Sequence, residues 1–180
     1  MNKTLCIIDL QYDHFPMGML EVKDTDTLIE GITDILKDYQ DIVLFSANYP
    51  ADHIRFAANH LWRKPGQKMD YEGEELSLYP IHSIEGSFGA EIHPSFLKTN
   101  KDFKEIRRGT NSKTNPSQLW EQEEELTKAL GLPQQTELHL CGIETDPKVW
   151  EKSITFLEQK GYTTKRIEEL IRSEVLPFDY

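Results

Sequence analysis

The chain alternates between short runs rich in β-branched and apolar residues and longer runs whose apolar residues recur at helical spacing. The strand-like runs cover residues 4–10, 41–47, 103–109, 136–142 and 162–167, and the helical patterns cover residues 27–36, 51–62, 116–132 and 147–161. After the last strand we expect a short helix and a tail. Such alternation builds right-handed βαβ units, whose parallel strands form a sheet covered on both faces. The sequence therefore predicts a three-layer α/β/α fold with a Rossmann-like parallel sheet.

The net charge and the distribution of apolar residues limit which classes of partner the chain can bind. The formal net charge of −11 over 180 residues argues against nucleic acid and against an anionic membrane. No apolar run is long enough to cross a bilayer, and the N-terminal residues indicate a buried strand rather than a signal peptide. We expect one cytoplasmic domain over residues 1–180. Cys6 and Cys141 lie in strand-like runs, which favours core thiols, with a disulfide as the alternative.

Chemistry-bearing residues follow the predicted strands. In a parallel sheet the ligand site lies at the carboxyl ends of the strands, where Asp9 follows the first strand and Arg108 ends the third. After the fourth strand, Asp146 is the expected N-cap of a helix with Pro147 at its first position. That arrangement points free N–H groups and the positive end of the helix dipole into the site. The irregular segment 63–97 is too long for a plain connection, so we expect it to cover the site.

Four segments resemble the isochorismatase and nicotinamidase superfamily of α/β hydrolases. They are "CIIDLQYDHFPMGMLEV" from Cys6, "YPADHIRFA" from Tyr49, "LYPIHSIEGSFGAEIHP" from Leu78 and "LCGIETDPKVW" from Leu140. The third resembles the family stretch "WPxHCxxGTxGAexHP", and the fourth resembles the stretch "CGxxTDxCV" that carries the nucleophile. The resemblance implies the isochorismatase-like hydrolase fold and the assembly into oligomers that family members often show. We therefore expect a homo-oligomer.

The resemblance also assigns the positions of the family's catalytic triad, which consists of Asp, Lys and Cys. Asp9 stands at the catalytic Asp, Arg108 stands where the Lys belongs, and Lys148 stands where the Cys belongs. An amine at the nucleophile position would form a stable amide with an acyl group, so turnover would stop after one attack. The sequence therefore predicts loss of cysteine amidohydrolase chemistry. Cys141 is no substitute, because it precedes the turn and is expected to point into the sheet.

The resemblance further implies a metal held by one Asp and three His, and this set is incomplete. Ala47 replaces the Asp, Tyr49 replaces the first His, and only His53 and His82 remain. Two imidazoles rarely hold zinc by themselves, so we expect no cofactor, with zinc or another divalent ion as the less favoured alternative. Tyr49, His53 and His82 then become candidate ligand-binding residues of the pocket wall, although His53 is equally consistent with an exposed helical position.

The turn after the fourth strand supplies the remaining candidates, Ile143 and Glu144, where the resemblance implies a non-proline cis peptide. Two interpretations of the charges stay open. Lys148 pairs with Asp9 or Glu144 at a half-exposed site, or Arg108 and Lys148 together bind an anion such as a carboxylate. A lysine with a depressed pKa that forms a Schiff base has no further support in the sequence.

Three functions compete at this stage. The first is a pseudoenzyme that binds a small ligand, with an anion as one candidate, or a partner protein. The second is a cysteine-independent hydrolase of isochorismatase type, in which Asp9 protonates a vinyl ether while Arg108 and Lys148 hold carboxylates. A general acid needs a raised pKa, whereas two adjacent cations favour the charged carboxylate, so this hypothesis ranks second. The third is an interaction subunit that pairs with an active relative.

Overall fold

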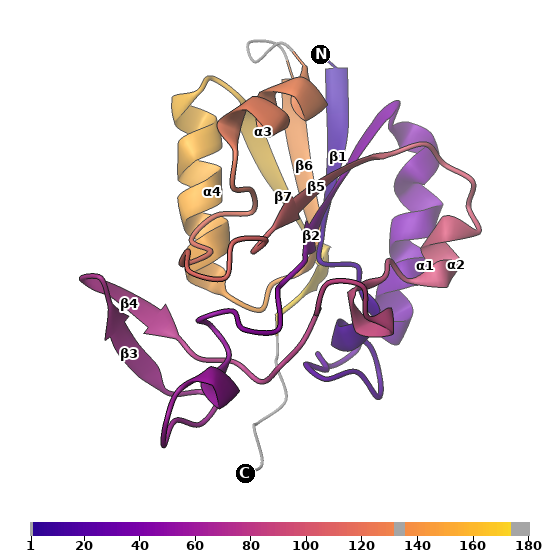
Figure 1. Cartoon of the computed structure of the whole chain (residues 1–180). Coiled ribbons are helices and arrows are strands. Elements are labelled where there is room, and N and C mark those ends of the chain that lie inside the picture. Colours follow the sequence, from indigo (N-terminus) through magenta and orange to yellow (C-terminus); the bar gives the residue numbers. More distant parts are fainter. Residues whose placement is uncertain (1, 132–135, 174–180) are drawn as a thin grey trace.

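A computed structural model of the chain describes residues 2–131 and 136–173. Its main sheet has five parallel strands in the order β5-β2-β1-β6-β7 (Figure 1). The strands are β1 (Asn2–Ile8), β2 (Asp41–Ala47), β5 (Lys104–Arg108), β6 (Thr136–Ile143) and β7 (Thr163–Arg172). The chain builds outward from β1 to β5, then returns to β6 on the other side of β1. Strand order therefore reverses between β1 and β6, where such folds bind ligands.

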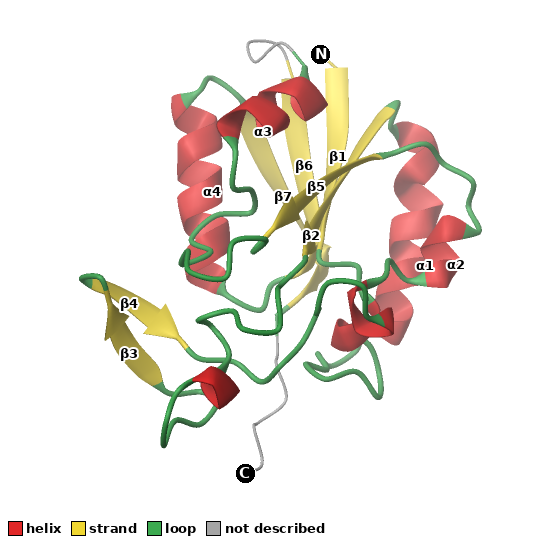
Figure 2. Cartoon of the chain, viewed as in Figure 1, coloured by secondary structure: helices red, strands yellow, loops and turns green. Residues whose placement is uncertain are grey.

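Helices cover both faces of this sheet (Figure 2). Helices α1 (Asp26–Ile35) and α2 (Pro94–Leu97) lie on one face, and α3 (Glu123–Leu130) and α4 (Pro147–Gln159) lie on the other. Successive residues of a strand point to opposite faces, so β1 serves both cores. Leu5 and Ile7 share one cluster with α1, and Cys6 and Ile8 share the other with α4. The predicted three-layer α/β/α fold is confirmed, and the continuous apolar run of β1 reflects burial on both faces.

The predicted covering segment contains a two-stranded antiparallel hairpin outside the main sheet. Its strands are β3 (Lys68–Tyr71) and β4 (Glu74–Ser77). Figure 1 shows the hairpin projecting beside the start of α4, at the carboxyl end of the sheet. Within the described residues, no helix is long and apolar enough to cross a membrane.

Three helix predictions need correction. Residues 51–62 form turns around one 3₁₀ turn, Ala57–Asn59, because distant backbone groups take the hydrogen bonds that a helix would use. The Ile54 N–H donates to the Ser112 carbonyl, and the Ala57 N–H donates to the Tyr79 carbonyl. The helix predicted over 116–132 is restricted to α3. The short helix after residue 167 is wrong, since β7 continues to Arg172 and pairs there with Ile143. The predicted tail lies outside the described residues.

Gly142 offers a test of how tightly β6 packs on β1. Its φ is 115°, and a Cβ at this position would lie 2.3 Å from the Ile8 carbonyl oxygen. Gly142→Ala should therefore lower the free energy of unfolding by about 3 kcal/mol or more, since backbone atoms of the central strand cannot yield easily.

Gly161→Ala is the matched control, because Gly161 also has a positive φ, 91°, but has no atom within 4 Å of the added methyl. It should cost about 1 kcal/mol. Urea unfolding of both variants measures the difference. Equal losses in the two variants would show that the contact with Ile8 contributes nothing.

Candidate functional site

A buried ion pair lies at the carboxyl end of the sheet. Asp9 follows β1 in a left-handed conformation with φ of 52°, and its N–H donates to the Phe45 carbonyl at 2.7 Å. Arg108, the last residue of β5, donates through Nη2 to the Asp9 carboxylate, and both side chains are buried. Burial opposes the charge of Arg108, but Asp9 and Tyr49 outweigh it and raise the guanidinium pKa. Two of the predicted triad positions therefore come together as a closed pair.

Tyr49 extends this pair to a second buried guanidinium, that of Arg55. The Tyr49 hydroxyl accepts hydrogen bonds from Arg108 Nη1, at 2.7 Å, and from Arg55 Nη1. The Arg55 guanidinium also lies over the ring of Tyr79, 4.3 Å from its centroid. Arg55 is only 3% exposed and forms no ion pair with any described carboxylate. We call these five residues, Asp9, Arg108, Tyr49, Arg55 and Tyr79, the arginine cluster.

Sequence reasoning missed Arg55 and Tyr79. Arg55 follows the candidate His53 by two residues, so the signal was a cation inside the segment that resembles the family's metal-loop stretch. Nothing local indicated that its side chain turns inward.

Lys148 points away from this cluster. Its side chain is 68% exposed, and its Nζ donates to Glu75 of β4 at 2.8 Å. The pairing of Lys148 with Asp9 or Glu144 is therefore wrong, and the structure does not bring Lys148 to the same ligand space as Arg108. Hydrogen bonding to Glu75 raises the Lys148 pKa, which argues against Schiff-base chemistry.

The covering segment closes over the start of α4, as predicted. Glu75 accepts from both Lys148 and Lys68, and these two bonds lower its pKa to about 2. Beneath this exposed contact, the Tyr79 hydroxyl donates to the Thr145 carbonyl at 3.1 Å. The N-cap is also as predicted, since the Asp146 carboxylate accepts from the Lys148 N–H at 3.1 Å.

Almost no free space remains where these elements meet. The site is lined by Asp9, Arg55, Arg108, Thr145, Asp146, Val149 and Trp150, and its cavity volume is ≈ 0 Å³. An adjoining groove that runs under Glu75 and Lys148 holds ≈ 50 Å³. A drug-sized ligand site usually measures about 300–1,000 Å³. In this conformation the side chains of the arginine cluster leave a volume of ≈ 0 Å³ beside Asp9 and Arg108.

The two candidate histidines lie in an aromatic cluster beside Tyr49 and Phe56. His53 is fully buried, which corrects the exposed position considered for it, and its ring centroid lies 4.8 Å from that of Tyr49. His82 is also buried, 5.3 Å from Tyr49 by the same measure, with Nδ1 2.8 Å from the Pro80 carbonyl. Burial, followed by the charge of Arg55, lowers the pKa of His53 to about 4 and that of His82 well below its usual value.

These surroundings do not fit the metal that the resemblance implies. Ala47 offers no donor atom, and the Tyr49 hydroxyl already accepts from two cations. Arg55 and Arg108 would repel a divalent ion placed there. Among residues 2–131 and 136–173, no three His, Cys, Asp or Glu side chains group closely enough to hold a metal.

The remaining candidates take structural positions. Ile143 is buried in the core that contains α1, and Glu144 pairs with Arg166 at 2.8 Å, so neither lines the site. The Ile143–Glu144 peptide is trans, as are the other described peptide bonds. Cys6 and Cys141 are free buried thiols, as predicted. Burial raises the pKa of Cys6 to about 12 and raises that of Cys141 as well, so neither supplies a thiolate.

A three-layer domain with this strand order and this site at its switch point has the isochorismatase-like hydrolase fold. A nicotinamidase of Acinetobacter baylyi is 32% identical over 94 residues, 52% of this chain and 44% of that protein. A nicotinamidase of Saccharomyces cerevisiae is 30% identical over 103 residues, 50% of this chain and 48% of that protein. The alignments thus span less than half of each relative. The chain is thus similar to nicotinamidases over about half of its own length.

Solved structures show the same fold. The yeast nicotinamidase bound to nicotinaldehyde matches with a TM-score of 0.81 and 24% identity, over 95% of this chain and 88% of that one. An isochorismatase-like hydrolase from Alkaliphilus metalliredigens matches with a TM-score of 0.67 and 14% identity, over 96% and 84%. No protein-family model matches the chain.

The histidine pKa values predict acid sensitivity. Unfolded His53 takes up a proton near pH 6.5, whereas folded His53 stays neutral down to about pH 4. Between these values the unfolded chain binds more protons, so the stabilising contribution is complete above pH 6.5 and is lost as pH falls. From pH 7.5 to pH 5, His53 should lower the free energy of unfolding by about 2 kcal/mol.

His53→Asn is the control for this titration. The Asn Oδ1 can replace His53 Nδ1 as the acceptor of the Arg55 N–H, a bond of 3.1 Å, while removing the ionisable ring. Urea unfolding across this pH range should show a shallower slope for the variant. The same slope in both proteins would refute the assignment to His53.

Proposed function

We propose that this chain is a pseudoenzyme of its superfamily, which acts by binding a partner protein and not by cysteine amidohydrolase chemistry. The observation that carries the proposal is the filled site: the Arg55 guanidinium lies on Tyr49 and Tyr79, and the space beside Asp9 and Arg108 has a volume of ≈ 0 Å³. A substrate cannot reach Asp9 without displacement of a buried guanidinium.

The chemistry of the residues supports the same proposal. Amide hydrolysis through an acyl intermediate needs a nucleophile that can later leave, an acid–base partner and donors for the oxyanion. At the nucleophile position this chain has Lys148, an exposed amine that is paired with Glu75. The general-base position is equally committed, since Asp9 accepts from Arg108. Each residue at a triad position is thus already paired: Asp9 with Arg108, and Lys148 with Glu75 at the surface.

The lack of free volume also helps to choose among the alternative functions. A small anionic ligand between Arg108 and Lys148 loses support because these side chains point to different surroundings. A vinyl-ether hydrolase would need the ether oxygen within hydrogen-bonding reach of Asp9, and the present volume leaves no room for it. Binding of a partner protein needs no internal cavity and is therefore the version we favour.

The first test is hydrolysis of nicotinamide, measured with and without added zinc. We expect no release of nicotinic acid above the buffer rate under either condition, while a nicotinamidase assayed in parallel turns over normally. Turnover that disappears in the Asp9→Asn variant would overturn the proposal, because it would show that the site opens and reacts.

A second test restores only the thiol. Lys148→Cys should give a cysteine that reacts with iodoacetamide, because this position is exposed. It should give no hydrolysis of nicotinamide, because Arg55 still fills the space beside Asp9. Mass spectrometry measures the alkylation and chromatography measures nicotinic acid. Hydrolysis by this single variant would show that the arginine cluster is no obstacle.

A further inference from the structure

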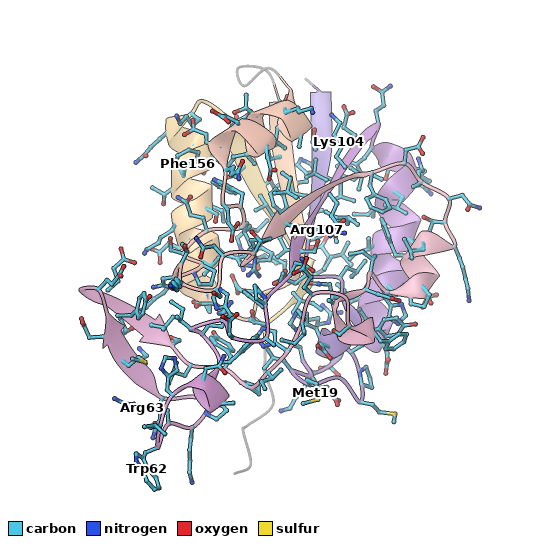
Figure 3. The ribbon with its side chains drawn as sticks, in the orientation of Figure 1. Met19, Trp62, Arg63, Lys104, Arg107 and Phe156 are labelled. Carbon is cyan, nitrogen blue, oxygen red and sulfur yellow. The ribbon has the colours of Figure 1, made fainter. Side chains whose placement is uncertain are left out.

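An exposed apolar tip projects from the loop that precedes the hairpin. We call residues 61–64 the Trp62 tip: Leu61 is 87% exposed and Trp62 is 96% exposed. Figure 3 shows Trp62 and Arg63 at an outer corner of the molecule, beyond the hairpin. A large aromatic side chain with almost no contact to its own chain is a common mark of an interaction surface.

The tip is held in place by its own backbone. The Arg63 N–H donates to the His60 carbonyl at 3.3 Å, and the Gly66 N–H donates to the Leu78 carbonyl at 2.8 Å. Trp62 has a φ of 61°, a left-handed conformation that bulky residues seldom adopt. The loop therefore presents Trp62 from a fixed base.

The cations of the tip form no ion pair with the part of the chain that the structure describes. Lys68, Lys148, Lys160, Arg107, Arg108 and Arg166 all form ion pairs. Arg63 and Lys64 form none with any described residue, although the chain carries a net charge of −11. The tip thus combines an apolar side chain with two free positive charges.

A groove of opposite character lies elsewhere on the surface. It has a cavity volume of ≈ 480 Å³, and its lining includes the acidic residues Glu85, Glu91 and Glu105, the cation Arg107, and the apolar residues Ala90, Ile92 and Leu97. Glu105 is neutralised by Arg107 at 3.1 Å, whereas Glu85 and Glu91 are exposed and have no ion-pair partner among the described residues. We call it the acidic groove: its lining combines apolar side chains with two carboxylates that have no ion-pair partner among the described residues.

We propose that the Trp62 tip of one copy docks into the acidic groove of a second copy of this chain. Trp62 would cover Ile92 and Leu97, and Arg63 and Lys64 would pair with Glu85 and Glu91. The two surfaces match in apolar character, in charge and in the lack of internal partners.

A copy does not use its own groove in this way. Figure 3 places Trp62 at the corner of the molecule and Arg107, which lines the groove, near its middle. The contact is therefore between copies, and two copies related by a two-fold axis would form it twice. A single contact of this size would be weak, and the repetition would strengthen it.

Charge exchange tests this contact with the full chain. We would prepare one variant with Arg63→Glu and Lys64→Glu and another with Glu85→Lys and Glu91→Lys. Each alone should lose association, because like charges then face each other. A mixture should associate at least as well as the parent, because each altered tip now meets a complementary groove. Sedimentation velocity over a range of concentrations measures the masses, and circular dichroism checks that each variant is folded.

Trp62→Ala should weaken association about 10-fold or more, as expected for a central aromatic contact. Met17→Ala is the matched control, since Met17 is 97% exposed and also has a positive φ, 72°. It should leave association unchanged. A parent chain that remains monomeric, a folded mixture that fails to associate, or equal effects of the two alanine variants would each overturn the proposal.

Discussion

The ion pair between Asp9 and Arg108 is the interaction around which the carboxyl end of the sheet is arranged. It joins the end of β1 to the end of β5 across the intervening strand β2. Both charges are buried, and a buried charge is tolerated only when it is paired and its donors are used. The hydroxyl of Tyr49, which follows β2, contributes by accepting from Arg108 Nη1, whereas Arg108 Nε and Asp9 Oδ1 have no hydrogen-bond partner among the described residues. Three neighbouring strands therefore end in one hydrogen-bonded unit.

The side chains of this unit depend on one another. A guanidinium is a planar fork, so Arg108 can hold Asp9 and Tyr49 at once, which the ammonium of a lysine does less well. Tyr49 in turn offers a hydroxyl to Arg55, and Gly109 makes room for its ring, since a Cβ there would lie 2.0 Å from Tyr49 Cε1. Asp9, Arg108, Tyr49 and Arg55 therefore form one packed unit, in which each side chain depends on its neighbours.

Local signals in the sequence predicted the strand ends and the helix cap of the site, but not the directions in which its side chains point. The strand ends at Asp9 and Arg108 and the cap at Asp146 depend on runs of neighbouring residues, and all three were confirmed. The inward turn of Arg55 depends on Tyr79, and the outward turn of Lys148 depends on Glu75, 73 residues away. The turns over 51–62 replaced a predicted helix for the same reason. Contacts between distant segments therefore determine the directions of the Arg55 and Lys148 side chains.

Two contacts close the site, and they differ in strength. The pair between Lys148 and Glu75 is exposed on both sides, and exposed ion pairs contribute little to stability. The stacking of Arg55 on Tyr79 is buried, and such a contact can contribute about 2 kcal/mol. The Tyr79 hydroxyl adds a hydrogen bond to the turn before α4. Loss of the pair between Lys148 and Glu75 would therefore leave the hairpin in place, because Leu76 and Leu78 stay buried beside Ala57. The arginine cluster, and not the visible salt bridge, is what separates Asp9 from solvent.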